Sequence, residues 1–550
     1  MSDYEVSSFG GLKIYRTTKH LIIANLILAL ISISIGGIAA IFVASGRSAV
    51  PSLINFLGIN NINYYQWLTF HGMNMLIFWI LWAEIAILYF ASSVLLNYPI
   101  YGYRIAWFAF AAMLYGQITV EYSILTGNAD VLFTAYPPLA ANDLFYIGYA
   151  IFVFGAGIAV VLFFLTIYYA KINEAYKGSL PLVTWGAAIA GIIALTVVFQ
   201  GALTLIYTLA WRLGLTSMNV MAYRWFFWGL GHDAQYVNVV ATIAVLYALL
   251  AIGTGLTAAK FINERYAKVA FALAALFVIP GIGHHILVDP GFSTVLKQAS
   301  GSVGSHFLSV PTLLHAFALT GALEATIRAS GHTSLFGWLR RIPWTNPAIA
   351  ATLFALISMG IGGITAQPQT TLQPNLNYHN TLWVPGHFHL MVAGGTTLAF
   401  MAFIYYALPI LTSRRLYSTK LAKLQIFLFG IGIIILGLVM TILGINGDPR
   451  RDFINPSDLL PAWSLTPLIL LGAGLAIAGG VLFILNVAVT IFTGKKGGNL
   501  FDGMITSFEV KNEASISKRG ALAICIIVVA ILLTVYFLSY WRLETMPELY

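Results

Sequence analysis

Apolar stretches separated by short polar loops run along almost the whole chain. A helix that crosses a bilayer needs about 20 mostly apolar residues, and about thirteen stretches reach that length. They lie near residues 20–44, 63–92, 104–126, 144–170, 182–212, 222–255, 266–289, 302–330, 347–366, 381–411, 422–445, 463–493 and 520–540. A membrane β-barrel would instead show short alternating strands. The pattern predicts an all-α integral membrane protein with about 13 transmembrane helices, organised as one membrane domain over residues 1–550.

The composition supports this prediction. Hydrophobic residues make up 59% of the chain and charged residues only 9%, whereas a soluble domain carries about 25% charged residues. The mean hydropathy is +0.86. The single cysteine, Cys525, lies in the last predicted span, which excludes disulfides within the chain and metal clusters bound by several cysteines.

The basic residues indicate how the chain is oriented. With the N-terminus inside, most of the 28 Lys and Arg residues fall on the inner loops, as the positive-inside rule requires. We therefore expect a plasma-membrane protein of a prokaryote, with residues 1–19 in the cytoplasm and the C-terminus outside. Residues 1–20 lack the pattern of a cleaved signal peptide. The net charge of +9 is explained by topology, so a nucleic-acid partner is not expected.

The segment 383–390, Trp-Val-Pro-Gly-His-Phe-His-Leu, places two histidines at the start of an apolar stretch. On an α-helix His387 and His389 point about 200° apart, so one helix can offer an imidazole to two metal centres on opposite sides. Imidazole is the commonest metal ligand in proteins, and ionisable groups at membrane depth usually serve a function.

Other histidines in the predicted spans complete a possible metal geometry. His71 and His389 can act as the two axial ligands of one six-coordinate haem, while His387 alone leaves a second haem with an open position. The adjacent pair His284 and His285 follows Pro280-Gly-Ile-Gly, which can loosen the helix and bring both rings together. With His232 they would form a three-nitrogen site that suits copper.

Tyr236 stands four residues after His232 and therefore lies on the same helix face. A phenol beside the proposed copper can give a proton and an electron to a bound oxidant.

These residues resemble subunit I of the haem–copper oxygen reductases, and most closely the B-type branch. The likeness rests on Tyr-Tyr-Gln-x-Leu-Thr-x-His-Gly at 64–72, Tyr-Pro-Pro-Leu at 136–139, Gly-His-x-x-x-Tyr at 231–236, His284-His285 with Asp289-Pro290 following, Phe336-Gly-Trp-Leu339, His379-Asn380, the Val-Pro-Gly-His-Phe-His-Leu run and Arg450-Arg451.

The resemblance implies reduction of O₂ to water, with proton uptake from inside and proton pumping. It implies two haems of a- or b-type and one copper ion. The implied roles are a low-spin haem on His71 and His389, a high-spin haem on His387, copper on His232, His284 and His285, a cross-link between Tyr236 and His232, and haem propionates near His379, Arg450 and Arg451.

Departures from the family pattern concern the proton routes. Many A-type members carry a glutamate two residues before the tyrosine, where this chain has Ala234, and this favours the B-type. Asp233 replaces a usual proline and either faces the copper or turns away to a neighbouring helix. Asn375 replaces an acid near the outer side. The resemblance makes Tyr247, Thr312 and His315 candidates for a single inner proton channel.

Two other functions fit part of the pattern. A nitric oxide reductase of the same superfamily shares the histidines but usually lacks a tyrosine at the position of Tyr236. A haem-free transporter would leave the histidines unexplained, and its usual internal repeat is not seen. Because one cysteine cannot form a dicopper electron-entry site, we expect other subunits, including an electron-accepting subunit II, and cytochrome c, a blue-copper protein or quinol as the donor.

Overall fold

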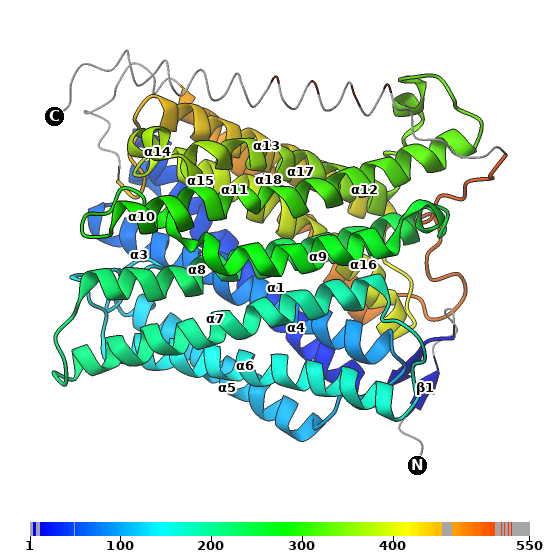
Figure 1. Cartoon of the computed structure of the whole chain (residues 1–550), viewed down its shortest axis with the longest axis horizontal. Coiled ribbons are helices and arrows are strands. Elements are labelled where there is room, and N and C mark those ends of the chain that lie inside the picture. Colours follow the sequence, from blue (N-terminus) through cyan, green and yellow to red (C-terminus); the bar gives the residue numbers. More distant parts are fainter. Residues whose placement is uncertain are drawn as a thin grey trace. The chain divides into compact units, whose positions relative to one another are not determined.

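The computed structural model describes residues 4–6, 11–48, 50–453 and 465–511, together with the single positions 519, 522, 526 and 530. Over these residues the chain is almost entirely helical (Figure 1). Eleven helices in the described part are long and apolar enough to cross a membrane. They are Arg16–Arg47, Asn61–Val94, Tyr103–Leu125, Asp143–Ile172, Leu182–Arg212, Val220–Gly253, Thr294–Ala329, Pro347–Thr370, Trp383–Thr412, Thr419–Ile445 and Pro467–Thr493.

Two of the predicted spans are not among these eleven. The stretch 266–289 begins as helix α9 (Glu264–Val278), which gives way to the 3-10 helix η4 (Ile279–Ile286). Its α-helical part has only 15 residues, or about 22 Å at 1.5 Å per residue, and the 3-10 helix continues it for 8 residues. Of the other stretch, 520–540, the structure describes only positions 522, 526 and 530, and Cys525 lies outside the described residues.

Two compact units make up the chain, and each is described by itself. The first comprises Met1–Ala241 and Arg451–Ala473. Its elements in chain order are β1 (Tyr4–Val6), β2 (Lys13–Tyr15), α1 (Arg16–Arg47), α2 (Pro51–Phe56), α3 (Asn61–Gly72), η1 (Met73–Phe78), α4 (Trp79–Tyr89), η2 (Phe90–Val94), α5 (Tyr103–Leu125), α6 (Asp143–Ile172), α7 (Leu182–Arg212) and the greater part of α8 (Val220–Gly253).

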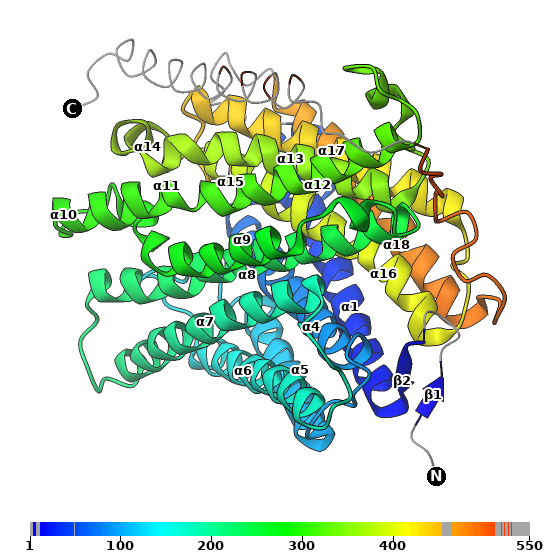
Figure 2. The same ribbon diagram turned by 45° about the vertical axis from the view of Figure 1, so that its right-hand side comes forward.

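Within this unit, α5 and α6 pack side by side along their length (Figures 1 and 2). Glycines make the close approach possible, because a Cβ atom on Gly116 would stand 2.5 Å from the carbonyl oxygen of Gly148. A Cβ atom on Gly155 would likewise stand 2.7 Å from the carbonyl oxygen of Ala109. Small residues at helix contacts are typical of membrane proteins, where dispersion contacts between backbones replace the hydrophobic effect.

A short antiparallel hairpin precedes the first long helix (Figure 2). Its strands β1 and β2 pair in the register Tyr4↔Tyr15, Glu5↔Ile14 and Val6↔Lys13. The loop after η2 holds the second strand, since the amide of Lys13 donates to Asn97 Oδ1 at 2.7 Å and the Tyr15 hydroxyl donates to the Asn97 carbonyl at 2.9 Å.

The second unit comprises Thr242–Arg450 and Gly474–Tyr550. After the end of α8 its elements are η3 (Ala258–Phe261), α9, η4, α10 (Thr294–Leu296), η5 (Lys297–Gly304), α11 (Ser305–Phe307), α12 (Ser309–Ala329), η6 (Gly337–Arg341), α13 (Pro347–Ala366), η7 (Gln367–Thr370), α14 (Leu372–Tyr378), α15 (Trp383–Phe388), η8 (His389–Thr397), α16 (Leu398–Thr412), α17 (Thr419–Ile445) and most of α18 (Pro467–Thr493).

Short π-helical segments interrupt several of the long helices. One of them, η1, begins two residues after His71, and another, η8, begins at His389. π-Helical turns are rare and occur frequently at functional sites.

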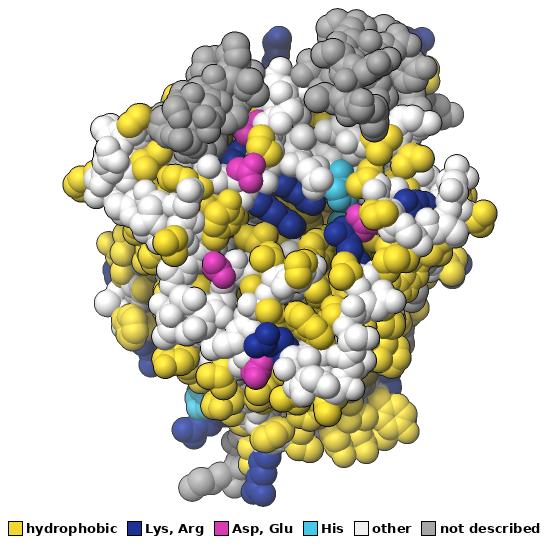
Figure 3. All heavy atoms as spheres, turned by 90° about the vertical axis from the view of Figure 1, so that its left-hand side faces the viewer, with side chains coloured by type: hydrophobic (Ala, Val, Ile, Leu, Met, Phe, Trp, Pro, Cys, Tyr) yellow, Lys and Arg dark blue, Asp and Glu magenta, His cyan; other side chains and the backbone are white. Residues whose placement is uncertain are grey.

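Large apolar side chains are exposed along the spans, among them Phe108, Tyr115 and Phe199 at 59%, 61% and 63% of their full exposure. A soluble protein would bury such side chains, whereas lipid covers them at no cost. The face in Figure 3 carries broad areas of hydrophobic side chains and a group of Lys and Arg side chains near its middle. These surfaces agree with a multi-pass membrane protein.

Candidate metal centres

The helix that carries His387 and His389 is held close to its neighbours. Gly386 makes this possible, because a Cβ atom there would stand 2.7 Å from the carbonyl oxygen of Gly437 on α17. His387 is the last residue but one of α15, and its Nδ1 lies 2.9 Å from the carbonyl oxygen of Gly362 on α13. His389 Nδ1 lies 2.7 Å from the carbonyl oxygen of Pro385 on its own helix. The two rings are thus anchored to different helices.

His71 is anchored in the same manner. Its Nδ1 lies 3.0 Å from the carbonyl oxygen of Gly36 on α1. A side chain at position 36 would collide with Met75 and Asn74, since its Cβ would stand 2.8 Å from the Met75 sulfur. The glycine therefore lets α1 approach the segment that follows His71.

These contacts determine which nitrogen can bind a metal. A carbonyl oxygen only accepts hydrogen bonds, so each contact requires the proton to be on Nδ1. The lone pair of the neutral ring is then on Nε2, the atom that can ligate iron or copper. Such an anchor also fixes the orientation of the ring, which is the usual arrangement around metal-binding histidines. His71, His387 and His389 all follow this pattern.

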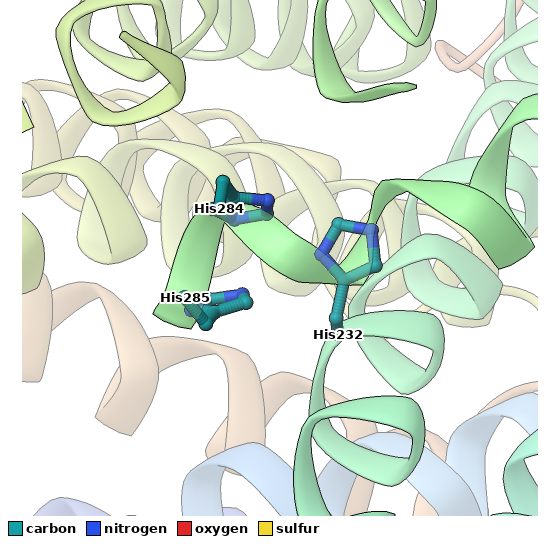
Figure 4. Close-up of side chains that lie close together, drawn as sticks. All are labelled: His232, His284 and His285. Carbon is teal, nitrogen blue, oxygen red and sulfur yellow. The ribbon is translucent and has the colours of Figure 1, made fainter. Parts of the chain in front are cut away.

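His284 and His285 come together on η4, as the loosened helix was expected to allow. Their ring centroids are 3.9 Å apart, with 37° between the ring planes. His284 Nδ1 lies 3.0 Å from the carbonyl oxygen of Gly281 and 3.1 Å from Ser305 Oγ. Figure 4 shows the two rings projecting in the same general direction from adjacent positions of the chain.

His232 and Tyr236 lie one turn apart on α8, with ring centroids 4.8 Å from each other. Asp233, between them in sequence, is buried and accepts a hydrogen bond from Thr196 Oγ1 on α7 at 3.1 Å. Of the two alternatives for Asp233, the structure therefore has the one in which the carboxylate turns to a neighbouring helix.

The candidates for an inner proton channel differ in their surroundings. Tyr247 on α8 and His315 on α12 are joined by a hydrogen bond of 3.0 Å between the hydroxyl and Nδ1. The Thr312 hydroxyl instead donates to the Leu308 carbonyl of its own helix at 3.1 Å. The structure thus brings together two of the three predicted residues.

Sequence reasoning missed a further pair of hydroxyls. Thr242 Oγ1 on α8 and Thr396 Oγ1 on η8 are 2.9 Å apart, and both side chains are buried. Thr242 lies between Tyr236 and Tyr247 along α8, and a search for hydroxyl residues between the two tyrosines would have found it. Nothing in the sequence connects it to Thr396, because that contact spans 154 residues.

His379 and Arg450, both expected near haem propionates, are linked through Asn380, the residue that follows His379. The Arg450 amide donates to the Asn380 carbonyl at 2.8 Å, and its guanidinium reaches Asn380 Oδ1 at 3.5 Å. His379 Nδ1 lies 3.1 Å from Asn375 Oδ1, and the amide nitrogen of Asn375 donates to the His284 carbonyl at 3.4 Å. Asn375, which replaces an expected acid, therefore connects His379 with the backbone of His284.

Arg451 is packed in the first unit. Its guanidinium lies over the Tyr136 ring at 5.7 Å from the centroid, and Arg224 lies over the same ring at 4.5 Å. Burial, and secondarily the positive charge of Arg224, lowers the pKa of the Arg451 guanidinium. Arginine nevertheless stays charged in proteins. Two neighbouring cations of this kind favour an anionic ligand between or beside them.

Comparisons with known proteins show the family to which the chain belongs. Residues 20–466 match the family model described as Cytochrome C and Quinol oxidase polypeptide I. The cytochrome c oxidase subunit 1 of Thermus thermophilus is 31% identical over 401 residues, which cover 71% of this chain and 69% of that protein. The subunit of the same name from a Synechocystis species is 23% identical over 449 residues, covering 79% of this chain and 77% of that protein.

A solved structure supports the fold. The structure of a haem–copper terminal oxidase dimer matches 98% of this chain and 94% of its own chain with a TM-score of 0.79 and 22% sequence identity. Together with the histidine set, these matches define the class of protein as a haem–copper terminal oxidase. The chain belongs to the family of polypeptide I of the cytochrome c and quinol oxidases. It is the catalytic subunit of a respiratory terminal oxidase, an oxidoreductase of electron transport that assembles with other oxidase subunits and uses haem and copper.

Proposed function

We propose that this chain is a B-type oxidase subunit that reduces O₂ to water at a haem–copper centre, with proton uptake from inside and proton pumping. The observation that carries the proposal is the shared anchoring of His71, His387 and His389, each with Nδ1 at a backbone carbonyl. This leaves Nε2 of three membrane-embedded rings as metal ligands. The B-type assignment rests on Ala234, which stands where many A-type members carry a glutamate.

The proposed haem ligands follow from these anchors. His71 and His389 would hold the low-spin haem, which would serve electron transfer. His387 would hold the high-spin haem alone and so leave one position open. His387 is anchored on α13, whereas His389 is anchored on its own helix. This difference supports two separate haem sites, one on each side of the helix that carries both histidines.

The proposed copper ligands are His232, His284 and His285, the three side chains labelled in Figure 4. Each offers one imidazole nitrogen as a ligand atom. Three nitrogen donors without a thiolate suit a redox copper with an open position. The close approach of the His284 and His285 rings, and the hydrogen bonds that orient His284, support this set.

The haems and the copper, when bound, supply the site for oxygen and most of the electrons. Tyr236 would supply one further proton and electron, and its ring is close enough to His232 for the cross-link that the family implies. Asp233 would hold α8 to α7 through Thr196 rather than act on oxygen.

Protons would reach Tyr236 from inside along α8. Tyr247 stands 11 residues further on, about 16 Å along the helix axis. The bond from Tyr247 to His315 and the Thr242–Thr396 hydroxyl pair are groups that can hold such protons. Thr312 would contribute less, since its hydroxyl is bound to its own helix. On the outer side, His379, Arg450 and Arg451 would meet the haem propionates.

We also propose that residues 1–550 act as one membrane domain, since α8 passes without a break from one unit into the other. Residues 1–19 would lie in the cytoplasm of a prokaryotic cell and the C-terminus outside. Electrons would enter through a partner subunit II from cytochrome c, a blue-copper protein or quinol. The family's name covers both cytochrome c and quinol oxidases, and haems of a- or b-type fit the same ligands.

Spectra and gas consumption of the purified complex test this proposal. We expect reduced-minus-oxidised bands of two haems, copper by elemental analysis, and oxygen consumption that stops when copper is removed. Absence of haem bands would contradict the proposal. Rapid consumption of nitric oxide with little oxygen uptake would instead assign the related reductase activity.

A further inference from the structure

A cluster of polar side chains lies among α1, α4 and α5 of the first unit, and Gln117 on α5 stands at its centre. The amide nitrogen of Gln117 donates to Ser32 Oγ on α1 at 2.9 Å and to Glu121 Oε1 at 2.7 Å. Its amide oxygen accepts from the Trp82 indole on α4 at 2.6 Å. Ser32, Trp82 and Gln117 are buried. The cluster therefore belongs to the interior of the unit and is not a solvated surface.

Glu121 is the member of this cluster that reaches the outside of the helix bundle. Its side chain is half-buried. Ile118 and Leu125, about one turn before and after it on the same face of α5, are 56% and 53% exposed. In a membrane such a face meets lipid. Within the described part of the chain, the hydrogen-bond partners of the Glu121 carboxyl are two amides, Gln117 and Asn74, rather than a cation. An ionisable group in such a place usually serves a function.

The cluster is also close to a proposed ligand of the low-spin haem. Asn74, the second amide partner of the Glu121 carboxyl, stands three residues after His71 and is completely buried. Residues three apart are neighbours on a helix surface. On α1, Ser32 stands one turn before Gly36, whose carbonyl oxygen lies 3.0 Å from His71 Nδ1. The two segments that carry and orient His71 thus also carry polar groups of this cluster.

These features suit a donor of hydrogen that is dissolved in the bilayer. The two oxygens of a carboxylate offer about four lone-pair sites, and the two amides leave some of them for a hydroxyl group of a ligand. A hydroquinone offers such hydroxyls, reaches the site through lipid because of its apolar tail, and carries electrons that a low-spin haem can accept. A donor protein from the aqueous phase would not approach this face, since lipid covers it.

We propose that Glu121 binds a hydroquinone at the lipid-facing side of α5 and accepts its protons, while its electrons pass to the low-spin haem held by His71 and His389. This inference rests on the proposed function, which leaves the donor open, and it adds a place where quinol gives electrons directly to this chain. Each hydroquinone loses two electrons and the protons of its two O–H bonds, and becomes the quinone. The protons leave one after the other through the carboxyl to the aqueous phase at the nearby end of α5. Two hydroquinones supply the four electrons that reduce one O₂ to water.

Glu121→Gln tests the acceptance of the proton in the complete oxidase. The amide keeps the size of the side chain and an oxygen that accepts a hydrogen bond, but it does not take up a proton. We expect oxygen uptake driven by decylubiquinol to fall about a hundredfold, a typical contribution of a positioned base, with both haem spectra unaltered. The reaction of the dithionite-reduced enzyme with oxygen should keep its rate, because it needs no donor site.

Binding gives a readout that is independent of turnover. Heptyl-hydroxyquinoline N-oxide resembles a quinol in shape and polarity, and its fluorescence is quenched when it binds beside a haem. We expect Glu121→Ala, which has no acceptor, to raise the Kd of this compound about tenfold, as loss of a hydrogen bond to a charged group does. Thr119→Val is the matched control, because the Thr119 hydroxyl donates to the Tyr115 carbonyl of its own helix. It should leave the quinol-driven uptake and the Kd unaltered.

The outcomes separate this inference from the proposed function. Unaltered quinol-driven uptake in Glu121→Gln, an unaltered Kd in Glu121→Ala, or equal losses in Thr119→Val would overturn the role of Glu121. An equal loss in the reaction of the reduced Glu121→Gln enzyme with oxygen would also overturn it, since the acid would then act at the oxygen-reduction site.

The unaltered protein supplies the remaining distinction. If it reduces oxygen after chemical reduction but takes no electrons from decylubiquinol, this inference alone fails. Missing haem bands, or no reaction of the reduced protein with oxygen, would instead contradict the proposed function.

Discussion

His387 Nδ1 lies 2.9 Å from the carbonyl oxygen of Gly362, on a helix other than its own. The contact fixes both the tautomer and the direction of the ring, since the carbonyl can only accept. Thr365 Oγ1, 3.2 Å from the same nitrogen, adds a second neighbour from α13. The ring of His387, which would hold the high-spin haem, is therefore oriented by α13. The ring of His389, which would help to hold the low-spin haem, is oriented by the Pro385 carbonyl of its own helix.

His387→Ala should remove the high-spin haem signal and spare the low-spin one. The reason is that His389 keeps its own anchor on Pro385 and does not depend on the neighbouring ring. Optical and magnetic spectra of the purified oxidase measure both signals. His306→Ala serves as a control, because His306 is exposed and bound to the Ser302 carbonyl. If both haems vanish from a folded protein, or neither does, the separate assignment is wrong.

Tyr236→Phe should abolish most of the oxygen reduction while keeping the haem spectra. The substitution removes the hydroxyl but leaves the ring that packs 4.8 Å from His232. Loss of a positioned proton donor costs about a hundredfold or more in rate. Oxygen uptake with a saturating donor measures the effect. Tyr122→Phe, on the exposed side of α5, should behave as the unaltered protein. Full activity of Tyr236→Phe would remove the tyrosine from the mechanism.

Thr242→Val should slow the uptake of protons from inside. The valine has nearly the same shape but cannot form the hydroxyl contact with Thr396. We expect a fall of about tenfold in turnover, which is less than the roughly hundredfold that a group transferring the proton directly contributes. Thr320→Val is the matched control, since its hydroxyl donates only to carbonyls of its own helix. Proton uptake in vesicles separates the two variants, and equal rates would argue against a route along this pair.

Gly116→Leu should destabilise the packing of α5 against α6. A Cβ atom there would stand 2.6 Å from the Phe152 amide nitrogen, and neither backbone can move without its partner. Overpacking of this kind costs about 1–3 kcal/mol. Thermal unfolding of the complex should show a lower Tm. Gly37→Ala, with nothing within 4 Å of the added atom, should remain within about 1 kcal/mol of the unaltered protein. A Gly116→Leu protein with unaltered Tm would contradict the close packing.

The membrane class and most helices could be predicted from the sequence, because hydropathy acts along the chain and needs no knowledge of neighbours. The family could be predicted for a related reason, since the motif 383–390 and the pair His284-His285 are contiguous. The break of the helix before His284 was also predictable, because glycine and proline act locally. The metal-binding roles of these residues remain predictions that the variants above test.

Long-range partners could not be predicted. The carbonyls that orient His71 and His387 belong to helices 35 and 25 residues away along the chain. Glycine at each of these positions looks like an ordinary small residue in an apolar span. The same holds for Thr242 and Thr396, whose contact depends on how α8 meets η8. Asp233 likewise left two alternatives open, until Thr196 on α7 was seen to donate to it.

The π-helical stretch His389–Thr397 makes this part of the protein sensitive to chain length rather than to composition. Removal of one residue from this stretch would turn the residues after it by up to about 100°, the rotation of one residue in an α-helix. Such a deletion would leave the hydropathy of the span almost unchanged and still permit insertion into the membrane. It would nevertheless carry Thr396 away from Thr242. The same deletion elsewhere in the span would have no chemical consequence, but in this stretch it would inactivate the enzyme. Natural variation in this segment should therefore proceed by substitution alone.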